Sequence, residues 1–236
     1  MLRQNEGEKM SSTTPILLSI FTIALCMLPL ACFPQKSSDR AVKGKPGDIQ
    51  LLSPSLEKGH SLMESLKRRR SARNFAPHAL PLDLLSSLLW AANGISSPDG
   101  RRTAPTGLNT QDTDVYVMLE SGVYLYDASK NLLRLVVPGD NRKLAGRQTF
   151  SHKAPLNLFL VHDRKRCMKG SEADINQFAG IHTGAILQNV YLFCAAHDLS
   201  CVARRSFDGA ALKKLLKLPE EQTVIMGETV GFPSQK

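Results

Sequence analysis

Apolar residues recur at helical spacing in the first part of the folded region. Leu62, Met63 and Leu66 predict a helix that runs directly into a cluster of basic residues. A second helix is predicted from Pro81, which suits a first helical turn, to Gly94, which ends the apolar face.

Strands are predicted where β-branched and aromatic residues cluster in short runs. These runs are 114–119, 123–126, 132–137, 157–161 and 223–230. Short polar connections between the first three predict antiparallel hairpins. A buried helix is predicted over 181–196, and Asp208 is placed to cap a further helix that ends at Pro219. Helices therefore surround a mixed, mostly antiparallel sheet, which is the α+β class.

The N-terminus carries an apolar run from Ile16 to Leu28, shorter than a comfortable membrane span. It predicts a signal peptide over residues 1–32, with fewer acidic residues if translation starts at Met10. The residues before Cys32 resemble a bacterial lipoprotein cleavage box, with Pro29 as a departure. Two interpretations stay open: a lipid anchor on Cys32, or an uncleaved anchor or unlipidated secreted product. Either predicts an exported protein, periplasmic or attached to a membrane.

Residues 33–50 are rich in Lys, Ser, Pro and Gly and predict a flexible tether ahead of one domain over 51–236. A chain of 236 residues with 42% hydrophobic residues is long enough for one such core. The net charge is +9, but the basic residues are scattered and lack interleaved aromatic residues. This argues against nucleic-acid binding and favours a phosphate site on an otherwise solvated surface.

The five cysteines and six histidines show no metal-binding spacing. No CxxC, HxxxH or HExxH pattern occurs, so neither a disulfide framework nor a metal site is predicted. Cys194 and Cys201 lie in or beside an apolar helical stretch, and we expect buried thiols there. A buried or surface role is likewise expected for His182.

Two polar segments carry candidate binding chemistry. Residues 69–75 offer guanidinium groups and a hydroxyl at a helix end, which suits a phosphate, although such clusters are also ordinary solvated surface. Residues 102–111 form a loop with two side-chain amides, which suits the polar edge of a flavin ring; an ordinary turn is the alternative. In the helix that follows later, Gly184 allows a planar ligand to approach the backbone.

In this order the three segments resemble the cofactor-binding blocks of the nitroreductase family, over about residues 57–234. The resemblance implies a three-layer fold and a homodimer whose interface holds two FMN molecules, each bound by both subunits. The implied cofactor-binding residues are Arg69, Arg70, Ser71, Arg73, Pro105, Thr106, Asn109, Gln111, Gly184 and Arg204. Arg204 is implied as a second phosphate ligand, with surface charge as the alternative, and Gln111 is the weaker of the two amides because Asp112 follows it.

The implied function is an FMN-dependent oxidoreductase. It would transfer hydride from a reduced small-molecule donor such as NAD(P)H through flavin N5 to an unidentified acceptor. No catalytic side chain is predicted, because the flavin carries the redox chemistry. A non-catalytic or degenerate flavin-binding module is the alternative, and export would favour a donor other than nicotinamide.

Overall fold

The computed structural model describes residues 44–167 and 169–234. The predicted signal peptide and residues 33–43 of the predicted tether lie outside these ranges. Ile49 and Gln50, the last residues of that tether, instead form strand β1 (Ile49–Gln50) and pair with Leu133 and Leu132. The sheet therefore begins before the predicted domain boundary, because two residues are too few to show an alternating pattern.

The helices of the described residues are α1 (Leu62–Arg68), α2 (Leu82–Asn93), η1 (Gly107–Asn109), η2 (Arg142–Leu144), α3 (Thr149–Lys153), α4 (Glu172–Ala196) and α5 (Gly209–Leu216). Local capping determines where the longer ones begin. The predicted Asp208 cap of α5 is confirmed, since its side chain accepts from the Ala211 N–H. Helix α4 begins nine residues earlier than predicted, because Ser171 and Asp174 form a capping box. Among these helices, none combines the length and apolarity required to cross a bilayer.

The strands are β1, β2 (Thr113–Met118), β3 (Gly122–Asp127), β4 (Leu132–Pro138), β5 (Leu156–Asp163), β6 (Ser200–Arg204) and β7 (Gln222–Gly231). All five predicted strands are confirmed, and β6 is an addition. The order across the sheet is β1-β4-β3-β2-β5-β7-β6. Every pairing among the described residues is antiparallel, so the expected mixed character is absent there. Helix α4 joins β5 to β6, which run in the same direction, but β7 lies between them.

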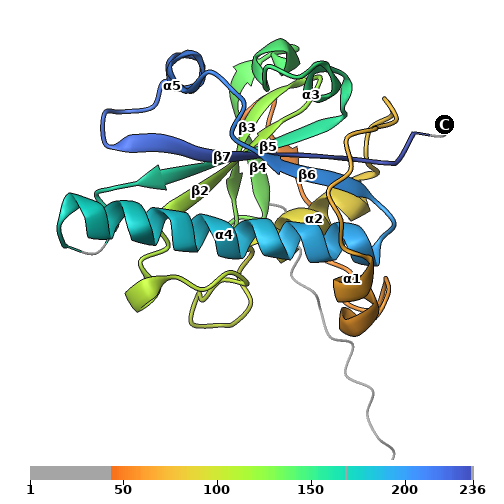
Figure 1. Cartoon of the computed structure of the whole chain (residues 1–236), viewed down its shortest axis with the longest axis horizontal. Helices are drawn as coiled ribbons and strands as arrows, with labels where there is room; N and C mark the ends of the chain where they lie inside the picture. Colours follow the sequence, from red (N-terminus) through yellow and green to blue (C-terminus); the bar gives the residue numbers. More distant parts are fainter. Residues whose placement is uncertain (1–43, 168, 235–236) are drawn as a thin grey trace, which may run out of the picture. The chain divides into compact units, whose positions relative to one another are not determined.

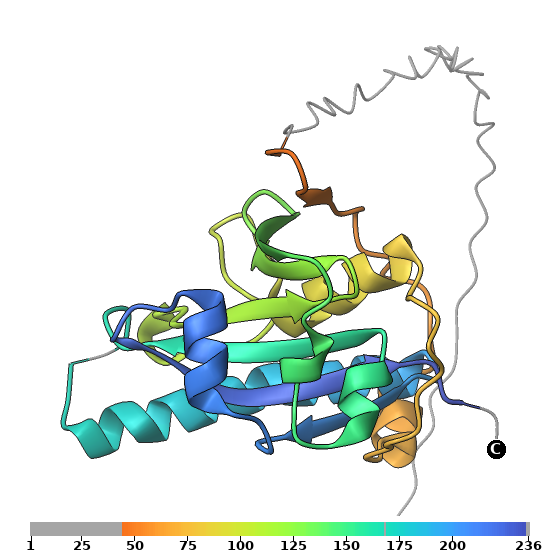
Figure 2. The same cartoon turned by 90° about the horizontal axis from the view of Figure 1, so that it is seen from above.

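Strand side chains alternate between two cores, one on each face of the sheet. Val115 and Leu158 pack in the first core with α2 and α4, whereas their neighbours Tyr116 and Phe159 pack in the second. Leu212 of α5 belongs to the second core. Helices α1, α2 and α4 accordingly lie on one side of the sheet, and α3 and α5 on the other (Figure 1). From above, α5 lies over β7 (Figure 2). The predicted three-layer α+β arrangement is confirmed.

Candidate functional site

The arginine-rich segment after α1 is anchored to α4 by one tyrosine. The Ser71 hydroxyl lies 2.8 Å from the Tyr191 hydroxyl, and the Arg69 guanidinium carbon lies 5.2 Å from the centre of the same ring. The Tyr191 oxygen also accepts the Ala203 N–H at 2.9 Å. Tyr191 therefore connects this segment to both α4 and β6, which gives an exposed chain segment a defined position.

Positive charge in this segment is only partly balanced. Arg68 pairs with the exposed carboxylate of Asp198. Among the residues that the structure describes, Arg70 donates only to the backbone oxygen of Arg68, at 3.3 Å. Within the described part of the chain, Arg69, Arg70 and Arg73 make no ion pair with a carboxylate. Three guanidinium groups thus remain available to an anion, and a phosphate dianion accepts charge-assisted hydrogen bonds of this kind.

A small cavity lies beside this segment. Its volume is about 190 Å³, and its lining includes Arg70, Ala72, Tyr191, Cys201 and Pro233. The two candidate phosphate ligands Arg69 and Arg73 are outside its lining, so the cavity covers only part of the segment.

The loop at 102–111 is braced from inside by Gln111. Its side-chain oxygen accepts from Arg102 Nε at 2.8 Å, and its side-chain nitrogen donates to the Gly100 oxygen at 3.0 Å and to Asn109 Oδ1 at 3.1 Å. Its backbone N–H donates to Thr106 Oγ1 at 3.0 Å. Both polar ends of the Gln111 amide are therefore occupied within the loop, so Gln111 holds the loop together.

Unlike Gln111, Asn109 leaves part of its side-chain amide without a partner among the described residues. Its side chain is exposed, and among the described residues its amide nitrogen has no hydrogen-bond partner. Pro105 is also exposed, and Thr106 is half-buried. Asn109 accordingly presents a hydrogen-bond donor to solvent from a loop whose shape is set by its neighbours.

Three residues of this loop occupy the left-handed region of backbone conformation. The φ angles are 50° at Leu108, 54° at Asn109 and 47° at Gln111. Such a conformation costs a non-glycine residue about 1–2 kcal/mol. Leu108 also leaves 86% of its surface exposed. Strain of this kind persists where surrounding structure enforces it and is concentrated at binding sites.

Residues buried under the loop hold its backbone in this left-handed conformation. His182 of α4 is 2% exposed, and its Nε2 accepts the Gly107 N–H at 2.8 Å. Its Nδ1 lies 2.9 and 3.0 Å from the two carboxylate oxygens of Asp112, which is fully buried. The expected buried role of His182 is confirmed. Sequence reasoning missed Asp112, which it treated only as a departure from the family pattern.

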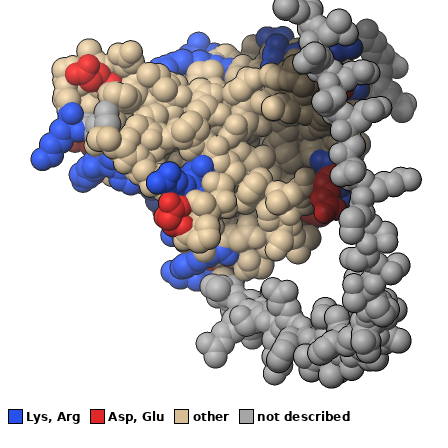
Figure 3. Space-filling view, turned by 90° about the horizontal axis from the view of Figure 1, so that it is seen from below, with Lys and Arg blue, Asp and Glu red and all other residues tan. Residues whose placement is uncertain are grey.

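The face of helix α4 that carries Gly180 and Gly184 is not covered by other described parts of the chain. Gly180 and Gly184 are exposed, and a Cβ built at either would meet no atom within 4 Å. No part of the described chain therefore packs closely against either glycine. Ile181 between them is 56% exposed. Viewed from the side of α4, α1 and η1, the surface shows broad areas without charged side chains (Figure 3).

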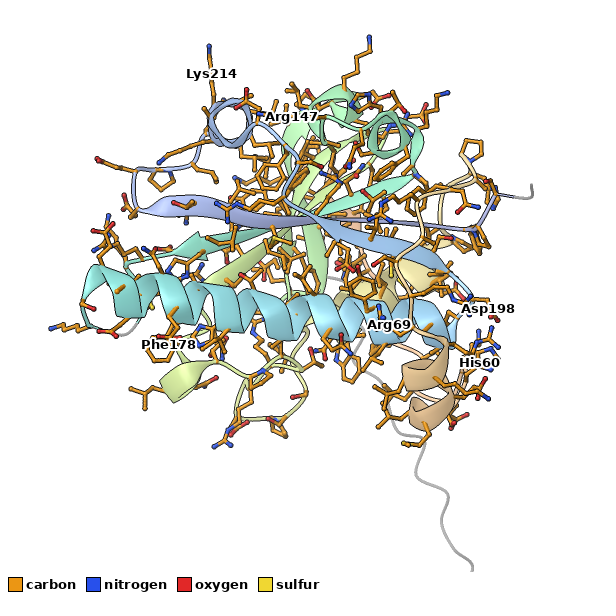
Figure 4. All side chains as sticks on the ribbon, viewed as in Figure 1. His60, Arg69, Arg147, Phe178, Asp198 and Lys214 are labelled. Atoms are coloured by element: carbon orange, nitrogen blue, oxygen red, sulfur yellow. The ribbon has the colours of Figure 1, made fainter. Side chains whose placement is uncertain are left out.

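The two polar segments contact α4 at separate points. The 102–111 loop meets it at His182, whereas the arginine-rich segment meets it at Tyr191. These positions are about 13–14 Å apart along the axis, because an α-helix rises 1.5 Å per residue. Figure 4 shows Arg69 beside one half of the helix and Phe178, a residue of the helix, on the other half. One copy of the chain thus carries the two segments without bringing them together.

The nitroreductase family profile matches residues 66–232, most of the chain. The chain belongs to the nitroreductase family. A nitroreductase-like protein of Methanocaldococcus jannaschii is 28% identical over 193 residues, which cover 78% of this chain and 96% of that protein. The range matched by the family profile includes the arginine-rich segment, the loop and α4, so the family membership predicted from them is confirmed.

Solved nitroreductase structures share the fold. One from Ralstonia eutropha JMP134 is 35% identical, with a TM-score of 0.76, and the similarity covers 80% of this chain and 90% of that one. The NADPH:FMN oxidoreductase from Vibrio harveyi, solved with NAD⁺, has a TM-score of 0.55 at 19% identity and covers 74% and 69%. The first comparison supports both fold and family, and the second supports the fold. Family membership makes this chain a flavin-dependent oxidoreductase in general terms.

The position of Arg204 differs from what the family resemblance implied for it, which was a second phosphate ligand. It is 6% exposed, so the surface-charge alternative is wrong. Its three guanidinium nitrogens donate to Thr229 Oγ1 at 2.9 Å, the Ala145 oxygen at 2.5 Å and Asn157 Oδ1 at 2.7 Å. The group lies over the Phe159 ring in the second core, and burial lowers its pKa to about 10. Its donors are directed into the α5 side of the sheet, so the structure assigns it to the core and not to a phosphate site.

Proposed function

We propose that this chain is an FMN-dependent oxidoreductase. It transfers hydride from a reduced donor such as NAD(P)H through flavin N5 to a small-molecule acceptor. The observation that carries the proposal is the segment at 69–73, where Ser71 is flanked in the sequence by three arginines that have no carboxylate partner among the described residues. An array of this kind fits a terminal phosphate, which FMN has and riboflavin lacks.

The residues present fit the rest of the cofactor as well. Arg69, Arg70, Ser71 and Arg73 would hold the phosphate. Asn109, with its unused amide donor, would face the acceptor edge of the ring or the ribityl chain, beside Pro105 and Thr106. Gly184 would leave room for the ring against α4. Bound FMN would supply the hydride chemistry, so the chain itself needs to bind, orient and exclude water.

The distance between the two segments supports a homodimer. The arginine-rich segment of one subunit and the Asn109 loop of the other would together form each site, because one chain holds them about 13–14 Å apart along α4. The uncovered glycines of α4 and exposed Leu108 and Ile181 offer an apolar, close-fitting surface for a second copy. A dimer of this kind carries two equivalent sites.

An absorption spectrum of the purified protein tests the cofactor. We expect a yellow protein with stoichiometric FMN, identified after release by chromatography against FMN, FAD and riboflavin. A colourless protein that takes up no added FMN contradicts the proposal. Steady-state oxidation of NADH, NADPH or a chemically reduced donor, with quinone and nitroaromatic acceptors, separates an enzyme from a non-catalytic flavin-binding module.

We further propose export and membrane attachment through Cys32, supported by the apolar run before it, which lies outside the described residues. Export would restrict access to NAD(P)H and favour another reduced donor. Cell fractionation of the full chain and its Cys32→Ala variant tests this. Export with attachment predicts that the wild type is found with membranes and the variant in the soluble exported fraction; cytoplasmic wild type contradicts it.

A further inference from the structure

Three side chains with metal-binding atoms meet where β2 begins and β5 ends. Asp112 directly precedes β2, His162 lies near the end of β5, and Cys167 follows in the next turn. Thr113 pairs with His162, and the Asp163 N–H donates to the backbone oxygen of Asp112 at 2.8 Å, so the strand ends are aligned. One ligand atom from each of the three side chains lies within 4.8 Å of the others.

The histidine in this cluster has hydrogen-bonding capacity that nothing described satisfies. His162 is 4% exposed, and neither ring nitrogen has a hydrogen-bond partner among the described residues. Asp112 Oδ2 lies 3.8 Å from Nδ1, which is beyond hydrogen-bonding distance. Burying a polar group without a partner is unfavourable. A ligand bound to a ring nitrogen would remove part of this cost.

The ligand types select the ion. A carboxylate, an imidazole and a thiolate are the oxygen, nitrogen and sulfur donors that Zn²⁺ binds, whereas Mg²⁺ and Ca²⁺ require oxygen ligands. Zinc bond lengths place one oxygen, one nitrogen and one sulfur ligand roughly 3.3–3.5 Å apart in a tetrahedral site, so these separations would have to contract by about 1.5 Å at most. Two anionic ligands would also neutralise the charge of the ion.

The surroundings supply a second layer of support. The carboxylate of Asp112 receives the Nδ1–H of His182, and hydrogen bonds of this kind hold ligating carboxylates in place. The nearby cation Arg166 is engaged elsewhere, because it pairs with Asp114 at 2.7 Å and with Asp163 at 3.3 Å. It also donates to the backbone oxygen of Gln111 at 2.9 Å. Its charge is thus matched by carboxylates outside the cluster.

We propose that Asp112, His162 and Cys167 bind a single Zn²⁺ ion, with a fourth position left to water. The ion would join the ends of β2 and β5 to the turn at Cys167. Through Asp112 and His182 it would also stiffen the connection to Gly107 in the loop. The site lies beneath that loop and is separate from the arginine-rich segment.

Metal binding to the full chain tests the site. We expect one Zn²⁺ per chain by elemental analysis after dialysis, and a tetrahedral Co²⁺ spectrum with thiolate charge transfer when Co²⁺ replaces it, recorded as a difference so that flavin absorption cancels. Loss of a second-layer partner typically costs 10–100-fold in affinity, so Cys167→Ser and His162→Ala should each cost at least about 100-fold. The thiolate band should vanish in Cys167→Ser.

Matched controls keep the result interpretable. Cys201→Ser removes a thiol outside the cluster, and His78→Asn removes an exposed histidine; both should retain wild-type Zn²⁺ affinity. Circular dichroism establishes that each variant is folded. Absence of Zn²⁺ from folded wild type, or equal affinity in wild type and Cys167→Ser, overturns the proposal. These readouts do not involve flavin, so they stand apart from the proposed oxidoreductase function.

Discussion

The Nε2 atom of His182 accepts the backbone N–H of Gly107 at 2.8 Å, across 75 residues of sequence. Because Nε2 is the acceptor, the ring proton resides on Nδ1 and is donated to Asp112. This contact holds the first residue of η1, immediately before the strained residues Leu108 and Asn109. A buried histidine that is hydrogen-bonded to Asp112 thereby sets the shape of an exposed loop.

Replacement of His182 by Ala should release that loop. It removes the acceptor for Gly107 and leaves the buried carboxylate of Asp112 without its partner, so the free energy of unfolding should fall by about 3–5 kcal/mol. Urea denaturation measures the loss, and hydrogen exchange at the Gly107 amide should accelerate. His197→Ala, at the C-terminal end of the same helix, is the control and should leave that amide unchanged. Unchanged exchange in His182→Ala would show that other contacts hold the loop.

Arg73 is exposed and unpaired among the described residues, so its loss should affect the ligand and not the fold. A hydrogen bond to a charged group contributes about 1.5–3 kcal/mol, so Arg73→Ala should weaken FMN binding by roughly 10- to 100-fold. Flavin fluorescence titration measures this, and riboflavin affinity should hardly change. Parallel losses for both ligands would remove Arg73 from the phosphate site.

In contrast to Arg73→Ala, Arg204→Ala should weaken the fold and not act on the ligand directly. It leaves the Ala145 oxygen without its buried donor and removes the contact with Phe159, so we expect the free energy of unfolding to fall by about 1–3 kcal/mol. Thermal or urea denaturation in the absence of flavin measures this loss. Wild-type stability combined with a selective loss of FMN affinity would restore Arg204 to the phosphate site.

Gly184→Leu tests whether α4 forms the dimer interface. A leucine there meets open space within the chain and has better helix propensity than glycine by about 1 kcal/mol, so the subunit should stay folded. If a second copy covers this face, the added side chain should produce monomers that lose FMN, as measured by light scattering and flavin content. Gly209→Leu places the same side chain in open space on α5, across the sheet, and should remain dimeric. A Gly184→Leu dimer with full flavin content argues against this interface.

Glu228 should make stability depend on pH. Its carboxylate oxygens are buried without partners among the described residues, and burial raises the pKa of this group well above its ordinary value. The folded state keeps the proton that the unfolded state releases above about pH 4.3, so stability falls as pH rises from there to the folded pKa. In this range the free energy of unfolding should fall by about 1.4 kcal/mol per pH unit. Glu228→Gln should lack this fall, and parallel curves for both proteins from about pH 5 to about pH 8 would show that Glu228 is not protonated in the fold.

Local spacing in the sequence determined the elements with clear periodicity. The alternation around Val115 and Tyr116 predicts a strand because successive side chains point to opposite faces, and both faces are buried here. Asp208 predicts a helix start because capping depends on residues within one turn. The arginine-rich segment and the Asn109 loop were likewise recognisable, since their donors are contiguous along the chain.

Only the tertiary structure decided which parts of the chain those segments contact. Arg204 reads as a surface cation or a phosphate ligand until β6 pairs with β7 and places it over Phe159. His182 and Asp112 are 70 residues apart, and no local pattern records that α4 packs beneath the loop. The separation of the two polar segments follows from the length of α4 and from the two points at which they contact it, and both depend on long-range packing.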